Sequence, residues 1–220
     1  MFGELFAGYP ENYPVESEDK ISILPFFATE DLPFDLVSFN DRGRAVNHSE
    51  IGIHHYKRDN SFASVLQHPL KWVEPLSQFK CVTPPDISIS PGMARWQRIR
   101  NTAYSRAVGA AWVSRGLKVL PAVRWVLLSD LEFVGLGIAR GSCIAISSYG
   151  AVRDAHAAQI FAQGAHLLQE QIQPEAILVY GSLDRALELS LSRKSQVKIV
   201  KPGGYWKSPK ENPSNNPLLF

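Results

Sequence analysis

Lys80-Cys81-Val82-Thr83-Pro84 and Leu117-Lys118-Val119-Leu120-Pro121-Ala122-Val123 are two short runs of β-type residues. Between them, Ser90-Pro91 is typical of a helix start, with Ser90 as N-cap and Pro91 at the first helical position. The sequence therefore predicts a strand, a helix from Ser90 to about Arg115, and a second strand. Two strands joined by a crossover helix form a βαβ unit, in which the strands run parallel.

The rest of the chain repeats this alternation. Further strands are predicted at 51–56, 142–147, 176–180 and 197–200, with another strand possible at 36–39 and a second long helix at about 153–171. The strands are continuous apolar runs, which is typical of parallel sheets covered on both faces. The predicted fold class is α/β, with a mostly parallel sheet of repeated β-α units. A complete or incomplete (β/α) barrel and an open doubly wound sheet both fit, and we favour the barrel because no strand is followed by a glycine-rich phosphate loop.

The helix predicted from Ser90 carries an apolar stripe that we expect to face the sheet. Its members recur at helical spacing and are Trp96, Ile99, Ala103, Ala107 and Ala110. This pattern predicts an amphipathic surface helix.

Charge divides the chain into three parts. Residues 1–31 hold seven acidic residues and one lysine, whereas residues 193–220 hold six basic residues and one glutamate. We therefore predict an irregular acidic arm at 1–35, a single α/β domain at 36–200 and a flexible basic tail at 201–220. The net charge of the whole chain is only +2, which argues against wholesale wrapping of nucleic acid.

The two cysteines, Cys81 and Cys143, lie in apolar runs and match no zinc spacing. We expect them to be buried and reduced, as in a cytoplasmic protein. No apolar run is long enough to cross a bilayer, so no membrane partner is predicted.

Several stretches, taken in order, resemble one family of phage and mobile-element proteins. They are Ile53-His54-His55-Tyr56, Pro85-Asp86-Ile87-Ser88 with Met93, Asn101, Tyr104 to Arg106, 119–125, 141–147 and Tyr180-Gly181-Ser182. The family is catalogued as domain of unknown function 4417, and the resemblance covers roughly residues 50–185. The chain departs from the family pattern at Lys57-Arg58, where an acidic residue is usual, and at Ala94, where a proline is usual. The resemblance implies a mobile-genetic-element setting and supplies no activity.

The polar residues that follow the strands form the candidate site, because ligands of parallel α/β folds sit at the carboxyl ends of the strands. Asp86 and Arg124 are the predicted catalytic residues: Asp86 as general base or cation ligand, and Arg124 as the group that holds an anion. The predicted ligand-binding residues are Asp59, Ser88, Trp125, Ser148, Tyr149 and Ser182. A purely structural alternative has Asp86 capping a turn and pairing with Arg124.

Other chemistry is less well supported. His54 and His55 are adjacent on a strand, so their side chains should point to opposite faces. No second His or Cys pattern lies near Asp59 or Asp86, so no metal ligand is assigned and no cofactor is identified. Ser148 and Ser182 lack a nucleophile elbow, which disfavours a hydrolase triad.

Three functional classes remain open. The first, which we favour, is a protein that binds or acts on a small anionic or nucleotide-like ligand at the strand ends. The second is a replication accessory that contacts nucleic acid through the stripe Arg95, Arg98 and Arg106, or a sliding clamp through the tail ending in Leu218-Leu219-Phe220. The third is a host-modulating factor that binds other proteins.

Overall fold

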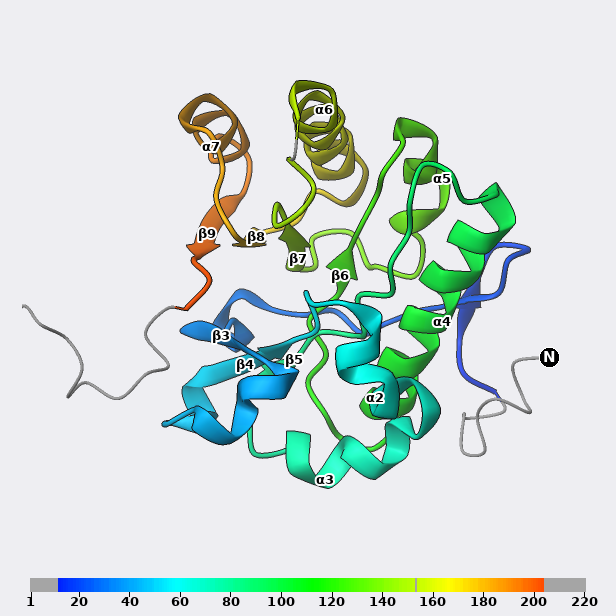
Figure 1. Cartoon of the computed structure of the whole chain (residues 1–220), viewed down its shortest axis with the longest axis vertical. Coiled ribbons are helices and arrows are strands. Elements are labelled where there is room, and N and C mark those ends of the chain that lie inside the picture. Colours follow the sequence, from blue (N-terminus) through cyan, green and yellow to red (C-terminus); the bar gives the residue numbers. More distant parts are fainter. Residues whose placement is uncertain (1–11, 153, 204–220) are drawn as a thin grey trace, which may run out of the picture.

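The structure is a computed structural model and describes residues 12–152 and 154–203. It is a mixed α/β fold with two parallel sheets (Figure 1). One sheet has the order β3-β4-β5, formed by Asp35–Ser38, Ile51–His54 and Cys81–Val82. The other has the order β6-β7-β8-β9, formed by Ala122–Val123, Ile144–Ser147, Ala176–Tyr180 and Gln196–Val200. The strands β1 (Val15–Glu16) and β2 (Ile21–Ser22) form a small antiparallel pair.

The segment before β6 connects the two sheets. Val119 forms a parallel bridge with Val82 of β5, and Ala122 and Val123 then pair with β7. All strand pairs in both sheets are parallel, which confirms that part of the prediction. Among the described strands, no pairing joins β9 to β3, so hydrogen bonding does not close the two sheets into a barrel.

The helices lie outside the sheets. In Figure 1, α5, α6 and α7 lie on the outer side of the four-stranded sheet, and α2 and α3 lie below the three-stranded sheet. The α-helices are α2 (Ala63–Gln67), α3 (Val73–Leu76), α4 (Arg95–Val113), α5 (Leu131–Val134), α6 (Ala155–Ile172) and α7 (Arg185–Leu191). Short 3-10 turns occupy Thr29–Asp31, Phe39–Arg44, His48–Glu50, Asp59–Phe62, Pro69–Trp72 and Leu128–Asp130.

Alternation along the strands divides the core into an inner and an outer layer. Outward residues such as Ile53 and Val82 pack with α4, and others such as Ile146 and Val179 pack with α6 and α7. The inner residues of both sheets form one separate cluster, whose members include Leu36, Cys81, Leu120, Ala122, Cys143, Ala145, Leu178, Tyr180 and Val200. Both faces of the strands are therefore buried, as their continuous apolar sequences predict.

The long helix α4 begins later than the sequence predicts. Ser90 to Met93 form a turn, and the helix starts at Arg95, where the side chain of Gln97 accepts a hydrogen bond from the Ala94 N–H (3.0 Å). Trp96 is 62% exposed, so its predicted inward position is wrong. The later members of the stripe, Ala103, Ala107 and Ala110, are buried as predicted, because they lie where α4 crosses the sheets.

The N-terminal segment packs against the body. Ile21, Leu24 and Phe27 are buried. The N–H of Cys143, the residue before β7, donates a hydrogen bond to the Phe27 carbonyl (2.9 Å). The three-part division of the chain remains a prediction, and most of the predicted tail, including Leu218-Leu219-Phe220, lies outside the described residues.

Cys81 and Cys143 are both buried and unpaired, as predicted. Burial raises the pKa of the Cys81 thiol to about 12, which leaves it protonated and unreactive at neutral pH. Within 12–152 and 154–203, none of the helices has the length and apolar character needed to cross a bilayer.

Candidate functional site

Polar side chains replace apolar ones on the inner faces at the carboxyl ends of the strands. Alternation from the inner residues Leu36, Ala122 and Ala145 places Ser38, Arg124 and Ser147 on the same inner side. Tyr180 lies opposite Ser147 in the register of β7 and β8. The parallel strands therefore bring these groups to one end of the molecule.

Asp86 and Arg124 form an ion pair at this end. The Arg124 Nε–H donates to both carboxylate oxygens of Asp86 (2.7 Å to Oδ1 and 2.9 Å to Oδ2), and Nη2 also donates to Oδ2. The Asp86 side chain is 5% exposed and that of Arg124 31%. The negative charge of Asp86 is the main cause that raises the pKa of the Arg124 guanidinium, so Arg124 is permanently charged.

Asp59 and Ser88 pair beside this ion pair. The Ser88 hydroxyl donates to Asp59 Oδ1 (2.7 Å), and the Ser88 N–H donates to both oxygens of the same carboxylate. Asn101 of α4 donates to the Ser88 carbonyl (2.9 Å), which fixes the loop after β5 on the helix. Asp59 therefore orders the loop that carries Asp86.

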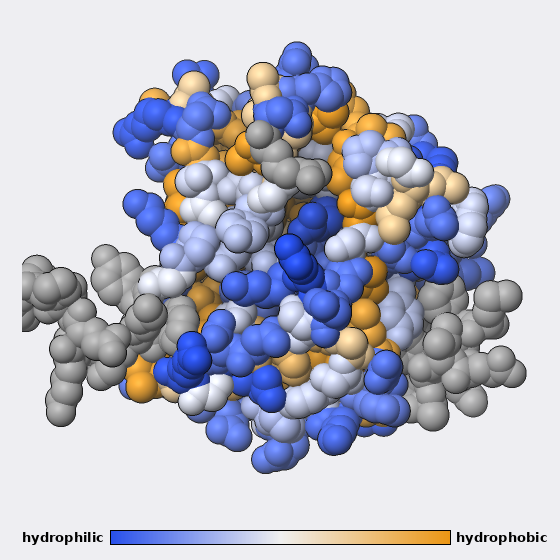
Figure 2. Space-filling model, viewed as in Figure 1, coloured by the Kyte–Doolittle hydropathy of each residue, from blue (hydrophilic) through white to orange (hydrophobic). Residues whose placement is uncertain are grey.

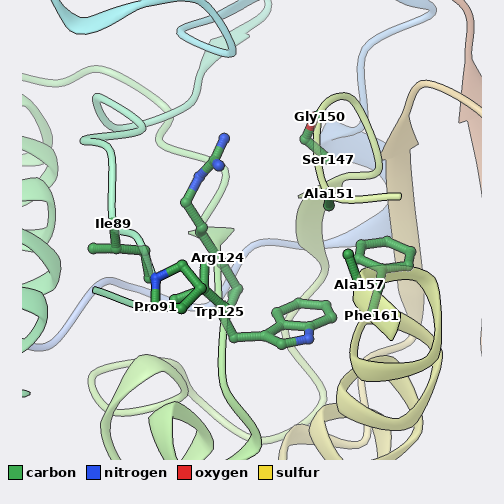
Figure 3. A pocket seen from close by; sticks show the side chains of 11 residues that line it. Ile89, Pro91, Arg124, Trp125, Ser147, Gly150, Ala151, Ala157 and Phe161 are labelled. Atoms are coloured by element: carbon green, nitrogen blue, oxygen red, sulfur yellow. The ribbon is translucent and has the colours of Figure 1, made fainter. Parts of the chain in front are cut away.

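A pocket of about 100 Å³ opens next to Arg124. Its lining comes from the loop after β5, the end of β6, the end of β7 and the first turns of α6; the residues include Ile89, Pro91, Ser147, Gly150, Ala151 and Ala157. Figure 3 shows the guanidinium of Arg124 extending away from Trp125, on the opposite side of the gap from Gly150 and Ala151. A second, smaller space of about 20 Å³ lies on the other side of Arg124, against Asp86, Asn101 and Arg106.

Trp125 lines the pocket, but its side chain is held by packing and a hydrogen bond against α6. Its ring stacks on Phe161 (centroids 5.2 Å apart, 11° between planes), and its indole N–H donates to the Ile160 carbonyl (3.2 Å). Gly164 leaves room for the indole, because a Cβ there would stand 2.1 Å from Trp125 Nε1. Trp125 therefore shapes the wall and keeps α6 in place, and its indole N–H is not available to a ligand.

Ser148 and Ser182 stabilise the turn after β8. The Ser182 N–H donates to the Ser148 hydroxyl oxygen (2.9 Å), and Gly181 adopts a positive φ of 123° there. A Cβ on Gly181 would stand 2.3 Å from the Ser148 oxygen. Ser182 lines a different space, next to Phe34 and Asp35, so the predicted set is not gathered in one pocket. Tyr149 is 60% exposed and contacts Tyr180 edge to face.

His54 and His55 point to opposite faces, as alternation predicts. His54 lies on the inner side, where its ring contacts those of Tyr56 and Tyr180. His55 packs among Phe39, Phe62 and Trp112, with Nδ1 2.9 Å from the Thr83 carbonyl. Burial lowers the pKa of His55 to about 3 and that of His54 well below its usual value. Both rings are neutral. The part of the chain that the structure describes contains no group of three or more His, Cys, Asp or Glu residues placed to hold a metal ion.

The predicted stripe of Arg95, Arg98 and Arg106 is not an exposed surface. Arg98 is buried against Asp130 (2.8 Å), and Arg106 is buried with its guanidinium donating to the Ala122 and Val134 carbonyls (2.7 and 3.0 Å). Arg95 remains half exposed and pairs with Glu132. The prediction of a basic face on α4 is wrong, because the side chains of Arg98 and Arg106 are buried and hydrogen-bonded to the loops and strands beside the helix.

The space-filling view shows mainly hydrophilic groups across the middle of the face seen in Figure 1, with smaller hydrophobic areas between them (Figure 2). Sequence reasoning missed other residues of this region, among them Ser147 and Gly150 of the pocket, and Tyr56, which follows β4. Tyr56 and Ser147 could have been found by extending the inward alternation one step past each strand's apolar run.

Comparisons with known proteins agree with the resemblance seen in the sequence. The chain is 29% identical over 139 residues to "Gene 1 protein" of Mycobacterium phage L5, which covers 63% of this chain and 61% of the relative. It is 31% identical over 140 residues to "Gene 1 protein" of Mycobacterium phage D29, which covers 63% of this chain and 52% of the relative. The chain thus spans less than two thirds of the length of either phage protein. No solved structure matches it.

Residues 15–198, most of the chain, match the family described as "Domain of unknown function (DUF4417)". The expected kinship with phage proteins is confirmed, and the protein belongs to the DUF4417 family.

Proposed function

We propose that the protein binds a small anionic ligand, such as the phosphate group of a phosphorylated or nucleotide-like compound, in the pocket beside Arg124. The observation that supports this most directly is the placement of Arg124. Arg124, whose permanently charged guanidinium is fixed by a buried carboxylate, lines a pocket at the carboxyl ends of parallel strands.

The geometry of the ion pair leaves part of Arg124 for a ligand. Its Nε and Nη2 face Asp86, while Nη1 donates no hydrogen bond within the described residues. A guanidinium presents five donors in a planar fork that suits phosphate and carboxylate oxygens. Because Asp86 fixes one edge of the fork, the other edge is oriented before a ligand arrives, which lowers the entropic cost of binding.

The size of the pocket limits what it can enclose. Its volume of about 100 Å³ is well below the roughly 300–1,000 Å³ of sites that bury a drug-sized ligand. We therefore propose that it encloses the anionic group alone. The remainder of the ligand would extend over the loop after β7, where Tyr149 is exposed and offers a ring for stacking.

The further predictions about this site remain proposals. General-base action by Asp86 requires Arg124 to release the carboxylate first, so binding is the better supported role. We also propose that the two sheets act together as an incomplete (β/α) barrel, supported by the single inner cluster to which both contribute.

Calorimetric titration with inorganic phosphate and with AMP tests the proposal. Wild-type protein should bind at least one of them, and Arg124→Gln should weaken binding at least tenfold, because charged hydrogen bonds of about 1.5–3 kcal/mol are lost. Arg185→Gln is the matched control, since Arg185 is 75% exposed and away from the pocket. Binding that is equally strong in Arg124→Gln, or absent from the wild type, would overturn the proposal.

A further inference from the structure

We infer that Tyr56 is a positioning residue of this site. Its hydroxyl donates a hydrogen bond to Asp86 when a bound anion takes hydrogen bonds from the Arg124 guanidinium. The inference rests on the function proposed above. It assigns a role to a residue that the strand-end prediction left out.

The Tyr56 hydroxyl is a buried polar group with no hydrogen-bond partner among the described residues. The residue is 3% exposed, and its hydroxyl oxygen makes no hydrogen bond within the described part of the chain. Buried hydroxyls are normally satisfied, and leaving one unpaired is unfavourable. The presence of a hydroxyl at this buried position therefore needs an explanation.

The ring of Tyr56 is fixed by its neighbours. It stacks on His54 and on Tyr180, with ring centroids 5.3 Å away in both cases. The Tyr56 N–H also donates to His54 Nδ1 (3.1 Å), which fixes the imidazole beneath it. The hydroxyl is therefore confined to one region of the site, and an acceptor must move toward it to form a hydrogen bond.

That region lies at the same strand ends as Asp86 and Arg124. Tyr56 follows β4 and Asp86 follows β5, the adjacent parallel strand, and Tyr56 packs in the inner cluster with Cys81 and Ala122. Burial, and then the negative charge of Asp86, raise the pKa of Tyr56 well above its usual value, while Arg124 opposes them. The hydroxyl is thus within electrostatic reach of the ion pair and carries a proton to donate.

Ligand binding creates the need for such a donor. Asp86 is buried, and in the described part of the chain its side chain receives hydrogen bonds from Arg124 alone. A bound anion competes with Asp86 for the same guanidinium, and a buried carboxylate that loses its ion-pair partner is strongly destabilised. A carboxylate has lone pairs for several donors, so a small shift of the released Asp86 carboxylate toward the Tyr56 O–H would form a hydrogen bond and offset that loss.

The test compares Tyr56→Phe with Tyr180→Phe. Tyr180 belongs to the same stack, but burial and then the nearby groups Tyr149, Asp35 and Asp41 raise the pKa of its hydroxyl, and Asp86 is not among them. Phosphate affinity is measured by calorimetry, and stability without phosphate by urea unfolding. We expect Tyr56→Phe to weaken phosphate binding about tenfold without lowering the stability of the phosphate-free protein, and Tyr180→Phe to leave phosphate affinity within twofold of wild type.

Three results would overturn the inference. If Tyr56→Phe binds phosphate within twofold of wild type while Arg124→Gln does not bind, the proposed function stands and the role of Tyr56 falls. If Tyr56→Phe loses stability and keeps its affinity, the hydroxyl is satisfied by a buried water. If wild-type protein does not bind phosphate or AMP, both the proposed function and this inference fail.

Discussion

At the scale of single residues, burial decides how much an ion pair contributes to the free energy of unfolding. Asp86 and Arg124 are mostly withdrawn from solvent, whereas the side chains of Arg95 and Glu132 are 47% and 67% exposed. Removing one partner of a fully buried pair costs about 3–5 kcal/mol of stability. The cost is about 1–3 kcal/mol for this pair, because Arg124 is one third exposed and solvent screens its charge. Asp86→Asn should lower the free energy of unfolding in urea by that amount. Glu132→Gln should lower it by less than about 1 kcal/mol, and equal losses in the two variants would contradict this account.

At the scale of elements, the position of α6 depends on the contact between Gly164 and Trp125. A Cβ at Gly164 would meet Trp125 Nε1 at 2.1 Å, so the helix or the indole must move. Overpacking of this kind costs about 1–3 kcal/mol and outweighs the gain in helix propensity. Gly164→Ala should therefore lower the thermal unfolding midpoint and disturb the pocket wall. Gly92→Ala, where no atom lies within 4 Å of the added Cβ, should leave the midpoint unchanged.

At the scale of the whole molecule, stability should depend on pH through the two buried histidines. Their pKa values are lowered in the folded protein, to about 3 for His55, whereas in the unfolded chain both take up protons near pH 6.5. The unfolded state therefore binds more protons below pH 6.5, and folding stability falls as the pH decreases. Each histidine should contribute about 1.4 kcal/mol per pH unit in that range. Urea unfolding at pH 7.5, 6.0 and 5.0 checks this, and a constant stability across the three values would contradict it.

Parallel strands joined by helices were predictable because local patterns encode them. Val119 to Val123 and Ile144 to Ile146 are apolar runs typical of a sheet covered on both faces. The ends of the strands predicted at 80–84 and 117–123 indicated Asp86 and Arg124 correctly as neighbours. Details set by tertiary contacts were not predictable. Arg98 and Arg106 were predicted to lie on an exposed stripe that contacts nucleic acid, because the carboxylate and carbonyls that bury them come from residues 122–136, distant in sequence. The start of α4 was misplaced because Ser90-Pro91 opens a turn of its own.

The most direct test of the central claim is nuclear magnetic resonance of the arginine side chains during a titration with inorganic phosphate. The Nε–H signal of Arg124 can be assigned by its loss in Arg124→Lys, and that of Arg95 in the same way. We predict that the Arg124 signal shifts progressively and reaches saturation, while the Arg95 signal stays in place. An Arg124 signal that does not respond to phosphate, or that moves no more than that of Arg95, would contradict the account.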